Sequence, residues 1–407
     1  GEIVFPSGAR YRILVLPLIK TMTPALLRKI ETLIADGAFV VGVPPVKSPG
    51  LSGYPECDTE VTQLSEKIWK AGTSAEALLQ VPHGKGFVIG GKALEKMKDN
   101  LYPHYDTLAK ILQEMNVTED FQADHVAIRY THRTHADWDI YFLSNKTDQY
   151  VNSRCQFRLN GGTATLWDPI TGKSYKVDND RFENDRYLLS LKFEPHQSYF
   201  LVFDRKSRRA TTPYESFFKN ETILTSLDGA WDVCFNPDFG GPEKRVFPIL
   251  SDWSQHPDDS IKYYSGIAIY RKEFMIPQTI SGEKSSVYID LGEVKNMARV
   301  KINGKEAGIL WTNPWKLDIS SLVKKGTNLV EIEVANLWVN RLVGDELLPN
   351  DGIEQGQWPA WLTNQQKRPG KRFTFTTYPH YTKKDPLLKS GLMGPVTIKL
   401  ATFGSDF

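Results

Sequence analysis

The side chains best suited to binding or chemistry are aromatic rings and amides that gather in the last third of the sequence. Carbohydrate recognition needs an aromatic face for the C–H groups of a sugar, with amides and carboxylates for its hydroxyls. Residues 311–315, 338–341 and 346–391 supply these types. They predict a carbohydrate-binding surface, whose candidate residues are Trp311, Asn313, Trp315, Trp338, Asn340, Arg341, Trp358, Trp361, Tyr378, His380 and Tyr381.

The segment 346–391 supports a second interpretation. It is rich in proline, glycine and aromatic residues, and it is too long to be an ordinary loop. Such a segment is either a functional flap or a cover that packs on a neighbouring domain. We favour packing slightly over direct contact with a sugar.

Asp345 and Glu346 are the most suggestive pair of acidic residues, because they follow the motif NRLVGD in a predicted loop. Hydrolysis of a glycosidic bond needs two carboxylates about 5–10 Å apart. The alternative is that Asp345 holds Arg341 by a charge-assisted hydrogen bond and fixes a corner of the chain. We favour this structural role and therefore assign no catalytic residue.

Two other motifs resemble known sites only superficially. His132, His135, Asp137 and Asp139 form a cluster, but on a strand or hairpin the two rings are poorly placed for one metal ion. We expect an exposed polar hairpin there and no metal site. The glycines of residues 90–92 follow a strand, yet they lack both phosphate-loop and dinucleotide-binding spacing, so they predict a plain turn.

Composition excludes several classes of partner. The net charge of +2, from 50 basic and 48 acidic residues, predicts no nucleic-acid partner. No apolar run reaches the roughly 18 residues of a membrane span. The three cysteines, Cys57, Cys155 and Cys234, are far apart in the sequence and form no CxxC motif. This excludes a metal-thiolate or redox motif; one disulfide is possible but not implied. The chain starts at Gly1, which we interpret as a processed or engineered N-terminus after removal of a leader.

The first part of the chain has an α/β pattern. Apolar strands are predicted at 11–17, 38–43 and 86–89, with a helix after Thr23 and Pro24 and further helices at 58–71 and 92–116. Three strands are too few for a (β/α)₈ barrel, which needs eight units over roughly 200–250 residues. We expect a partial flavodoxin-like domain at residues 1–118.

The remainder reads as β-structure. Six short strands separated by turn signals predict a β-sandwich at 119–205, followed by a basic linker at 206–222. A second sandwich is predicted at 223–407, where apolar and polar residues alternate from 286 to 340 and Asn303-Gly304 indicates a two-residue hairpin turn. The predicted fold class is therefore multidomain and mainly β, with two antiparallel sandwiches after the α/β domain.

The second sandwich resembles two known families. The segments LGEV at 291–294, ARVKING at 298–304, GILWTNPW at 308–315 and GTNLVEIEVAN at 326–336 resemble the galactose-binding-like jelly roll, including the family 2 sugar-binding domain. The segments NLWVNRLVGD at 336–345, FTFTTYPHY at 373–381 and SGLMGPV at 390–396 are similar to the C-terminal region of glycoside hydrolase family 106, the α-L-rhamnosidases. The opening residues 11–24 are similar to the small α/β domain after that family's barrel.

The resemblance also implies what this sequence lacks. Members of the family carry an N-terminal barrel whose two glutamates and bound calcium perform hydrolysis, and none of that precedes Gly1. The chain is expected to be a non-catalytic C-terminal portion, accessory to carbohydrate degradation, with a catalytic barrel domain or chain as partner. The resemblance further implies a periplasmic or extracellular location. A calcium ion bound in a jelly-roll loop is an open alternative, for which we name no ligands.

Two other functions stay open at this stage. One is a stand-alone carbohydrate-binding protein, which predicts heat on titration with rhamnose-containing oligosaccharides. The other is a structural scaffold that docks a catalytic barrel, which predicts an exposed apolar patch of more than a few hundred Å².

Overall fold

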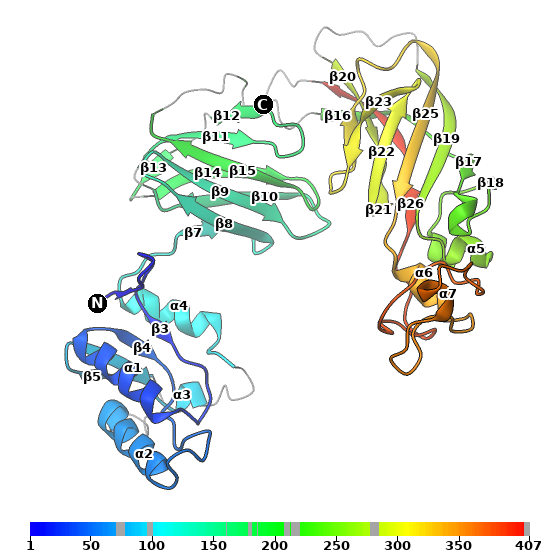
Figure 1. Cartoon of the computed structure of the whole chain (residues 1–407). Coiled ribbons are helices and arrows are strands. Elements are labelled where there is room, and N and C mark those ends of the chain that lie inside the picture. Colours follow the sequence, from blue (N-terminus) through cyan, green and yellow to red (C-terminus); the bar gives the residue numbers. More distant parts are fainter. Residues whose placement is uncertain are drawn as a thin grey trace. The chain divides into compact units, whose positions relative to one another are not determined.

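The chain forms two compact units, Gly1–Glu119 and Asp120–Phe407. The computed structural model describes residues 1–70, 78–95, 101–159, 161–177, 181–184, 186–206, 212, 220–276 and 285–402. Figure 1 labels the elements, and each unit is described by itself. The predicted fold class is confirmed, because strands dominate and most sheets are antiparallel.

The first unit is a small sheet between helices. The strand order is β3-β4-β6-β5, in which β3, β4 and β6 are parallel and β5 runs antiparallel to β6. Its elements are β1 (Ile3–Val4), β2 (Arg10–Tyr11), β3 (Leu14–Val15), α1 (Pro24–Asp36), β4 (Phe39–Val41), α2 (Glu56–Trp69), β5 (Leu79–His83), β6 (Gly86–Gly90), α3 (Lys92–Glu95) and α4 (Tyr105–Glu114). The expected strand 11–17 is shorter than predicted, and the sequence analysis missed β5.

Helix α1 forms where its end signals predict it. Thr23 caps the first turn by accepting a hydrogen bond from the Leu26 N–H, and Pro24 occupies a position that needs no N–H donor. Gly37 ends the helix at φ 124°. Successive side chains of β4 and β6 point to opposite faces of the sheet, so these strands contribute to two cores. Val40 and Val88 belong to one apolar cluster, and the next residues, Val41 and Ile89, belong to another.

The first sandwich of the second unit consists of two antiparallel sheets, ordered β13-β14-β10-β7 and β12-β11-β15-β9-β8. Large aromatic side chains fill the space between them, among them Tyr141, Phe157, Phe193 and Phe203. The strands are β7 (Phe121–Ala123), β8 (Ile128–Thr134), β9 (Trp138–Asn145), β10 (Val151–Phe157), β11 (Thr163–Trp167), β12 (Ser174–Lys176), β13 (Arg181–Glu183), β14 (Arg186–Phe193) and β15 (Ser198–Asp204).

The second sandwich has its own core and pairs the sheets β16-β27-β20-β24 and β18-β17-β19-β25-β22-β23. Its strands are β16 (Asn220–Ser226), β17 (Trp231–Cys234), β18 (Arg245–Phe247), β19 (Ile267–Ile276), β20 (Ser285–Asp290), β21 (Glu293–Lys295), β22 (Met297–Ile302), β23 (Lys305–Leu310), β24 (Lys316–Asp318), β25 (Gly326–Ala335), β26 (Gly391–Gly394) and β27 (Thr397–Thr402). Its helices are α5 (Asp259–Lys262), α6 (Val339–Asp345) and α7 (Ala360–Thr363).

The hairpin prediction in this sandwich is confirmed. Asn303 and Gly304 have φ values of 51° and 79°, and β22 and β23 pair on either side of them. The predicted strand through residue 340 is wrong at its end, because β25 stops at Ala335 and α6 follows. Strand β16 begins inside the expected linker, and most of that linker, 207–211 and 213–219, lies outside the described residues.

Two simpler expectations concern cysteines and membranes. Cys57, Cys155 and Cys234 all lie in the described part and have free thiols, so no disulfide joins them. Among the described helices, none combines the length and apolar character that crossing a membrane requires.

Candidate functional site

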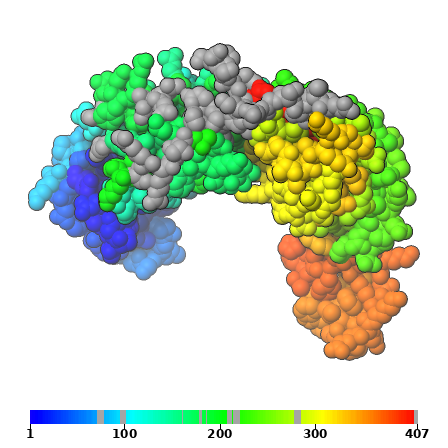
Figure 2. Space-filling model, turned by 90° about the horizontal axis from the view of Figure 1, so that it is seen from above, coloured from blue at the N-terminus to red at the C-terminus, as the bar shows by residue number. Residues whose placement is uncertain are grey.

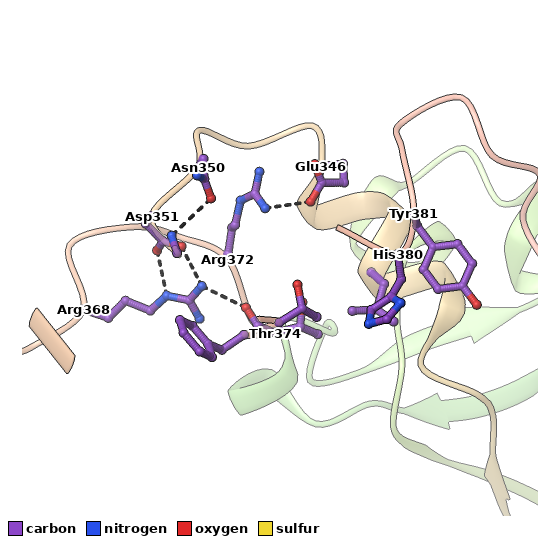
Figure 3. Close-up of a pocket in the computed structure, with 12 residues that line it drawn as sticks. Glu346, Asn350, Asp351, Arg368, Arg372, Thr374, His380 and Tyr381 are labelled. Atoms are coloured by element: carbon purple, nitrogen blue, oxygen red, sulfur yellow. Dashed lines mark hydrogen bonds and ion pairs between the residues drawn. The ribbon is translucent and has the colours of Figure 1, made fainter. Parts of the chain in front are cut away.

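The segment 346–390, between α6 and β26, is the candidate functional region. It forms a lobe at one end of the second sandwich, coloured orange in Figure 2. A small polar cavity lies within it (Figure 3) and has a volume of about 30 Å³, which holds about one or two water molecules. Its lining residues are Leu342, Glu346, Asn350, Asp351, Gly352, Arg368, Arg372, Thr374, Phe375, Thr376, His380 and Tyr381.

An arginine–aspartate pair closes one wall of this cavity. Arg368 donates from Nε and Nη2 to the two carboxylate oxygens of Asp351, both at 2.7 Å (Figure 3). The hydrogen bond from Arg368 holds the pKa of Asp351 below its ordinary value. The guanidinium also lies 5.2 Å from the centre of the Trp361 ring, and Trp361 donates to the carbonyl of Asp351. Trp361 therefore contacts both members of the pair and stabilises it.

Arg372 lines the same cavity. Its Nη1 donates to Glu346 Oε1 at 2.7 Å, while Nε and Nη2 donate to the carbonyls of Pro349 and Leu348. A planar guanidinium suits such a set of acceptors. Because both acidic residues of the cavity are bound to arginines, their arrangement serves to fix the loop after α6.

Asp345 anchors the middle of the segment, at residues 373–374. Its Oδ2 accepts hydrogen bonds from the N–H groups of Phe373 and Thr374 and from the Thr374 hydroxyl, at 2.7–2.9 Å. The expected hydrogen bond to Arg341 is wrong, since the nearest pair of atoms is 3.9 Å apart. Arg341 instead places its guanidinium 4.6 Å from the centre of the Phe373 ring. The corner of the chain is fixed as expected, but by backbone donors.

Asn340 performs a similar task one turn earlier in α6. Its side chain exchanges hydrogen bonds with both backbone groups of Leu388 and donates to Ser390 Oγ. Asn340 is 1% exposed and Arg341 is 7% exposed. Neither side chain is accessible to a sugar in this structure.

The other predicted binding residues are dispersed. Only His380 and Tyr381 line the cavity, and Tyr378 touches the His380 ring edge-on. Trp358 stacks beside the cavity on Phe375. Trp315 belongs to the core of the sandwich, while Trp311 and Asn313 lie in the β23–β24 connection.

The lobe and its base expose many large apolar side chains. Trp338, Trp358 and Tyr378 are each more than half exposed, and Trp338 touches Phe239 edge-on. The others that expose at least 40% of their surface are Leu337, Leu347, Leu362, Phe373 and Leu388. This concentration is the kind of surface that packing on another domain would cover.

Part of the histidine cluster forms a partly buried network in the first sandwich. His132 lies between two carboxylates, with Nδ1 3.0 Å from Asp120 and Nε2 3.0 Å from Asp139, and it stacks on Tyr141. Arg205 pairs with the other oxygen of Asp139. The expected hairpin forms between β8 and β9 and His135 at its tip is 55% exposed, but His132 and Asp139 belong instead to a partly buried histidine clamp. Within the described ranges, no group of three metal-binding side chains occurs.

The clamp predicts a pH-dependent stability. Burial lowers the pKa of His132, but the hydrogen bonds and charges of Asp120 and Asp139 outweigh burial and raise this pKa above its usual 6.5. Stabilisation by His132 should be complete below about pH 6.5 and lost as the pH rises through the folded-state pKa. The pKa of Asp120 is lowered from 3.8, so its contribution disappears only in stronger acid.

Urea unfolding at about pH 5.5 and about pH 9 measures this effect. The wild-type chain should lose more stability between the two pH values than the His132→Gln variant. His135→Gln is the matched control, because the His135 side chain is 55% exposed. Equal pH dependence in the wild type and His132→Gln would contradict the role of the clamp.

Comparisons with known proteins agree with this architecture. The model of glycoside hydrolase family 106, described as alpha-L-rhamnosidase, matches residues 1–181. The rhamnosidase structure from Novosphingobium sp. PP1Y aligns with 98% of this chain and 34% of its own, at 32% identity and a TM-score of 0.59. A Formosa agariphila protein named "Putative beta-glucuronidase" is 43% identical over 178 residues, which are 43% of this chain and 15% of that protein.

The fold and these matches define the class of this protein. It is a multidomain, mainly β protein that is related to glycoside hydrolases, which degrade carbohydrates. The resemblance to the α-L-rhamnosidases of family 106 is confirmed. The chain spans about a third of the length of the Novosphingobium rhamnosidase, and less of the Formosa protein.

Proposed function

We propose that this chain is a non-catalytic, accessory portion of an α-L-rhamnosidase-like glycoside hydrolase. The observation that carries the proposal is the alignment of nearly the whole chain with about a third of a rhamnosidase. The remaining two thirds of such an enzyme provide room for a catalytic barrel. The accessory portion would then position the barrel and its substrate.

The acidic residues of the small cavity support this assignment. A glycosidase needs one carboxyl group with a raised pKa as general acid and a second carboxylate on the other side of the glycosidic bond. Arg368 shifts the pKa of Asp351 in the opposite direction. A cavity of about 30 Å³ is also too small for a sugar ring.

We further propose that the exposed apolar side chains of the lobe face a catalytic barrel, as a scaffold would. Ion pairs and Asp345 hold the lobe in one conformation. Binding of a barrel to its aromatic surface would therefore lose little conformational entropy. The alternative, a stand-alone carbohydrate-binding protein, draws on the same exposed rings. A flat heat signal on titration with rhamnose-containing oligosaccharides would exclude it.

An assay with an aryl α-L-rhamnoside tests the accessory role. The folded 407-residue chain is expected to release no aryl group above the rate of buffer alone, because arginines bind both carboxylates of the small cavity. The Novosphingobium rhamnosidase serves as the positive control. Turnover by this chain that Asp345→Asn or Asp351→Asn abolishes, without loss of fold, would overturn the proposal.

The periplasmic or extracellular location is part of the same proposal. Fractionation of the source cells, followed by detection with an antibody against this chain, would test it. Recovery in the cytoplasmic fraction would contradict it.

A further inference from the structure

A second and larger cavity lies between the two sandwiches, within the unit Asp120–Phe407. Its volume is about 390 Å³, which is in the range of small-molecule binding sites. The first sandwich contributes the turns around Thr171 and Gln197, with Tyr175. The second contributes Tyr288, the end of β23 and β24. None of the candidate binding residues chosen from the sequence lines this cavity.

The cavity has a fixed floor. Lys316 Nζ lies 2.9 Å from Glu194 Oε2 in the first sandwich and 2.9 Å from Glu221 Oε2 in β16. The Lys316 side chain is 11% exposed. Because this ion-pair cluster ties the two walls together, their spacing is defined by the fold and not by chance contact.

The charges of the floor are satisfied among themselves. Glu194 and Glu221 share Lys316, and Lys399 links Glu221 to Asp290 at 3.3 and 2.7 Å. An ionic ligand would have to compete with these buried pairs. The floor itself therefore offers no free charge to a ligand, and the other charged residues of the lining, Asp168, Lys173 and Asp318, carry both signs.

The walls offer hydrogen-bond donors and apolar faces side by side. Gln197 is 93% buried; its Oε1 accepts from the Glu194 N–H at 2.9 Å, and its Nε2 has no partner within the described part of the chain. Tyr175 and Tyr288 also line the cavity and are half-buried, and the Tyr288 hydroxyl is already hydrogen-bonded to Asp318. Ile309 and Leu317 add an apolar surface.

We propose that this cavity binds one neutral sugar unit of a carbohydrate chain. A sugar ring combines hydroxyls for the free amide of Gln197 with C–H faces for the tyrosine rings and Ile309. The choice of a sugar among neutral polyhydroxylated molecules rests on the proposed accessory function. The cavity is separate from the lobe, so its ligand need not be the substrate at the catalytic centre.

Titration of the whole chain tests the site. Probes are a neutral rhamnose-containing oligosaccharide, a neutral glucose oligosaccharide and an oligogalacturonate, followed by calorimetry. At least one neutral probe should bind, and the acidic probe should bind at least tenfold more weakly. Gln197→Glu keeps the oxygen that accepts from Glu194 and removes the two donors, so it should weaken the neutral probe at least tenfold.

A second variant keeps the test decisive if Gln197→Glu fails to fold. Ile309→Trp, at a position that is 43% exposed, should fill the cavity and also reduce affinity at least tenfold. Tyr150→Ala is the control, because Tyr150 is a 72% exposed ring of the same unit that does not line the cavity. Absence of binding for both neutral probes, or unchanged affinity in folded Gln197→Glu and Ile309→Trp, would overturn the site. Neither outcome affects the accessory role, which the rhamnoside assay tests separately.

Discussion

Replacement of Asp345 by alanine is expected to lower the free energy of unfolding of the second sandwich by about 3–5 kcal/mol. Asp345 is 1% exposed and its Oδ2 satisfies three donors of the Phe373–Thr374 corner. Its removal leaves two backbone N–H groups without their acceptor, each of which costs about 1–3 kcal/mol.

Arg341 adds to this cost. Its guanidinium is buried with Asp345 as the nearby carboxylate, and within the described residues its Nε and Nη2 have no hydrogen-bond partner. Burial lowers the pKa of Arg341, and the Asp345 charge opposes this shift. In the alanine variant the buried cation loses its counter-charge, so the loop 346–373 should detach from α6.

Urea unfolding, followed by tryptophan fluorescence, measures the loss. Asp345→Asn separates shape from charge, because its amide oxygen can still accept from the two N–H groups; we expect an intermediate effect. Asp232→Ala is the control, since Asp232 and its partner Lys244 are at least half exposed and their pair is worth less than about 1 kcal/mol. A loss of less than about 1 kcal/mol in Asp345→Ala would refute the anchoring role.

The local elements of this fold could be predicted from the sequence because their signals are local. Thr23, Pro24 and Gly37 act within one or two turns of α1 and mark the two ends of that helix. The turn at Asn303-Gly304 is similar, since its backbone conformation depends on those two residues.

Elements that depend on tertiary contacts were missed or misplaced. Strand β5 contains Pro82, which argues against a strand except at a sheet edge, and β5 is an edge strand. The end of β25 is set by Asn336, whose amide bonds to Gly266 N–H and the Tyr264 carbonyl, about seventy residues away. Helix α6 is too short for a helical period to stand out from the preceding alternation.

The sites were predicted in part for the same reason. The structural role of Asp345 was inferred, yet its partners lie 28 and 29 residues further on and no spacing rule identifies them. Lys316 and Glu194 are 122 residues apart, so neither their pairing nor the cavity above them could be found from sequence alone. Residue type marked 346–391 as unusual; only the contacts distinguish anchors from exposed rings.

Replacement of Lys316 by methionine should have the second large effect, a loss of about 3–5 kcal/mol that is shared by both sandwiches. Methionine preserves most of the volume but leaves Glu194 and Glu221 facing one another without the ammonium group between them. Glu221 retains Lys399 at 3.3 Å, whereas Glu194 loses its ion-pair partner. Mutual repulsion should then drive the two walls of the larger cavity apart.

Differential scanning calorimetry measures this outcome. The wild-type unit Asp120–Phe407 should unfold with the sandwiches coupled, and Lys316→Met should separate their transitions, because Lys316 joins the two. Lys389→Met is the matched control, since the Lys389 side chain is 63% exposed and its pair with Glu293 contributes less than about 1 kcal/mol. Unchanged transitions in Lys316→Met would contradict the coupling.

The pH dependence of the variant distinguishes lost charge balance from lost packing. Two carboxylates without the ammonium group of Lys316 between them repel, and protonation of one of them relieves this repulsion. Lowering the pH from about 7 to about 5 should therefore protonate one of them and restore part of the stability of Lys316→Met relative to the wild type. Adding Glu194→Gln to Lys316→Met should restore a similar part at neutral pH, because the amide removes the same unpaired charge. If neither change narrows the difference, packing and not charge accounts for the contribution of Lys316.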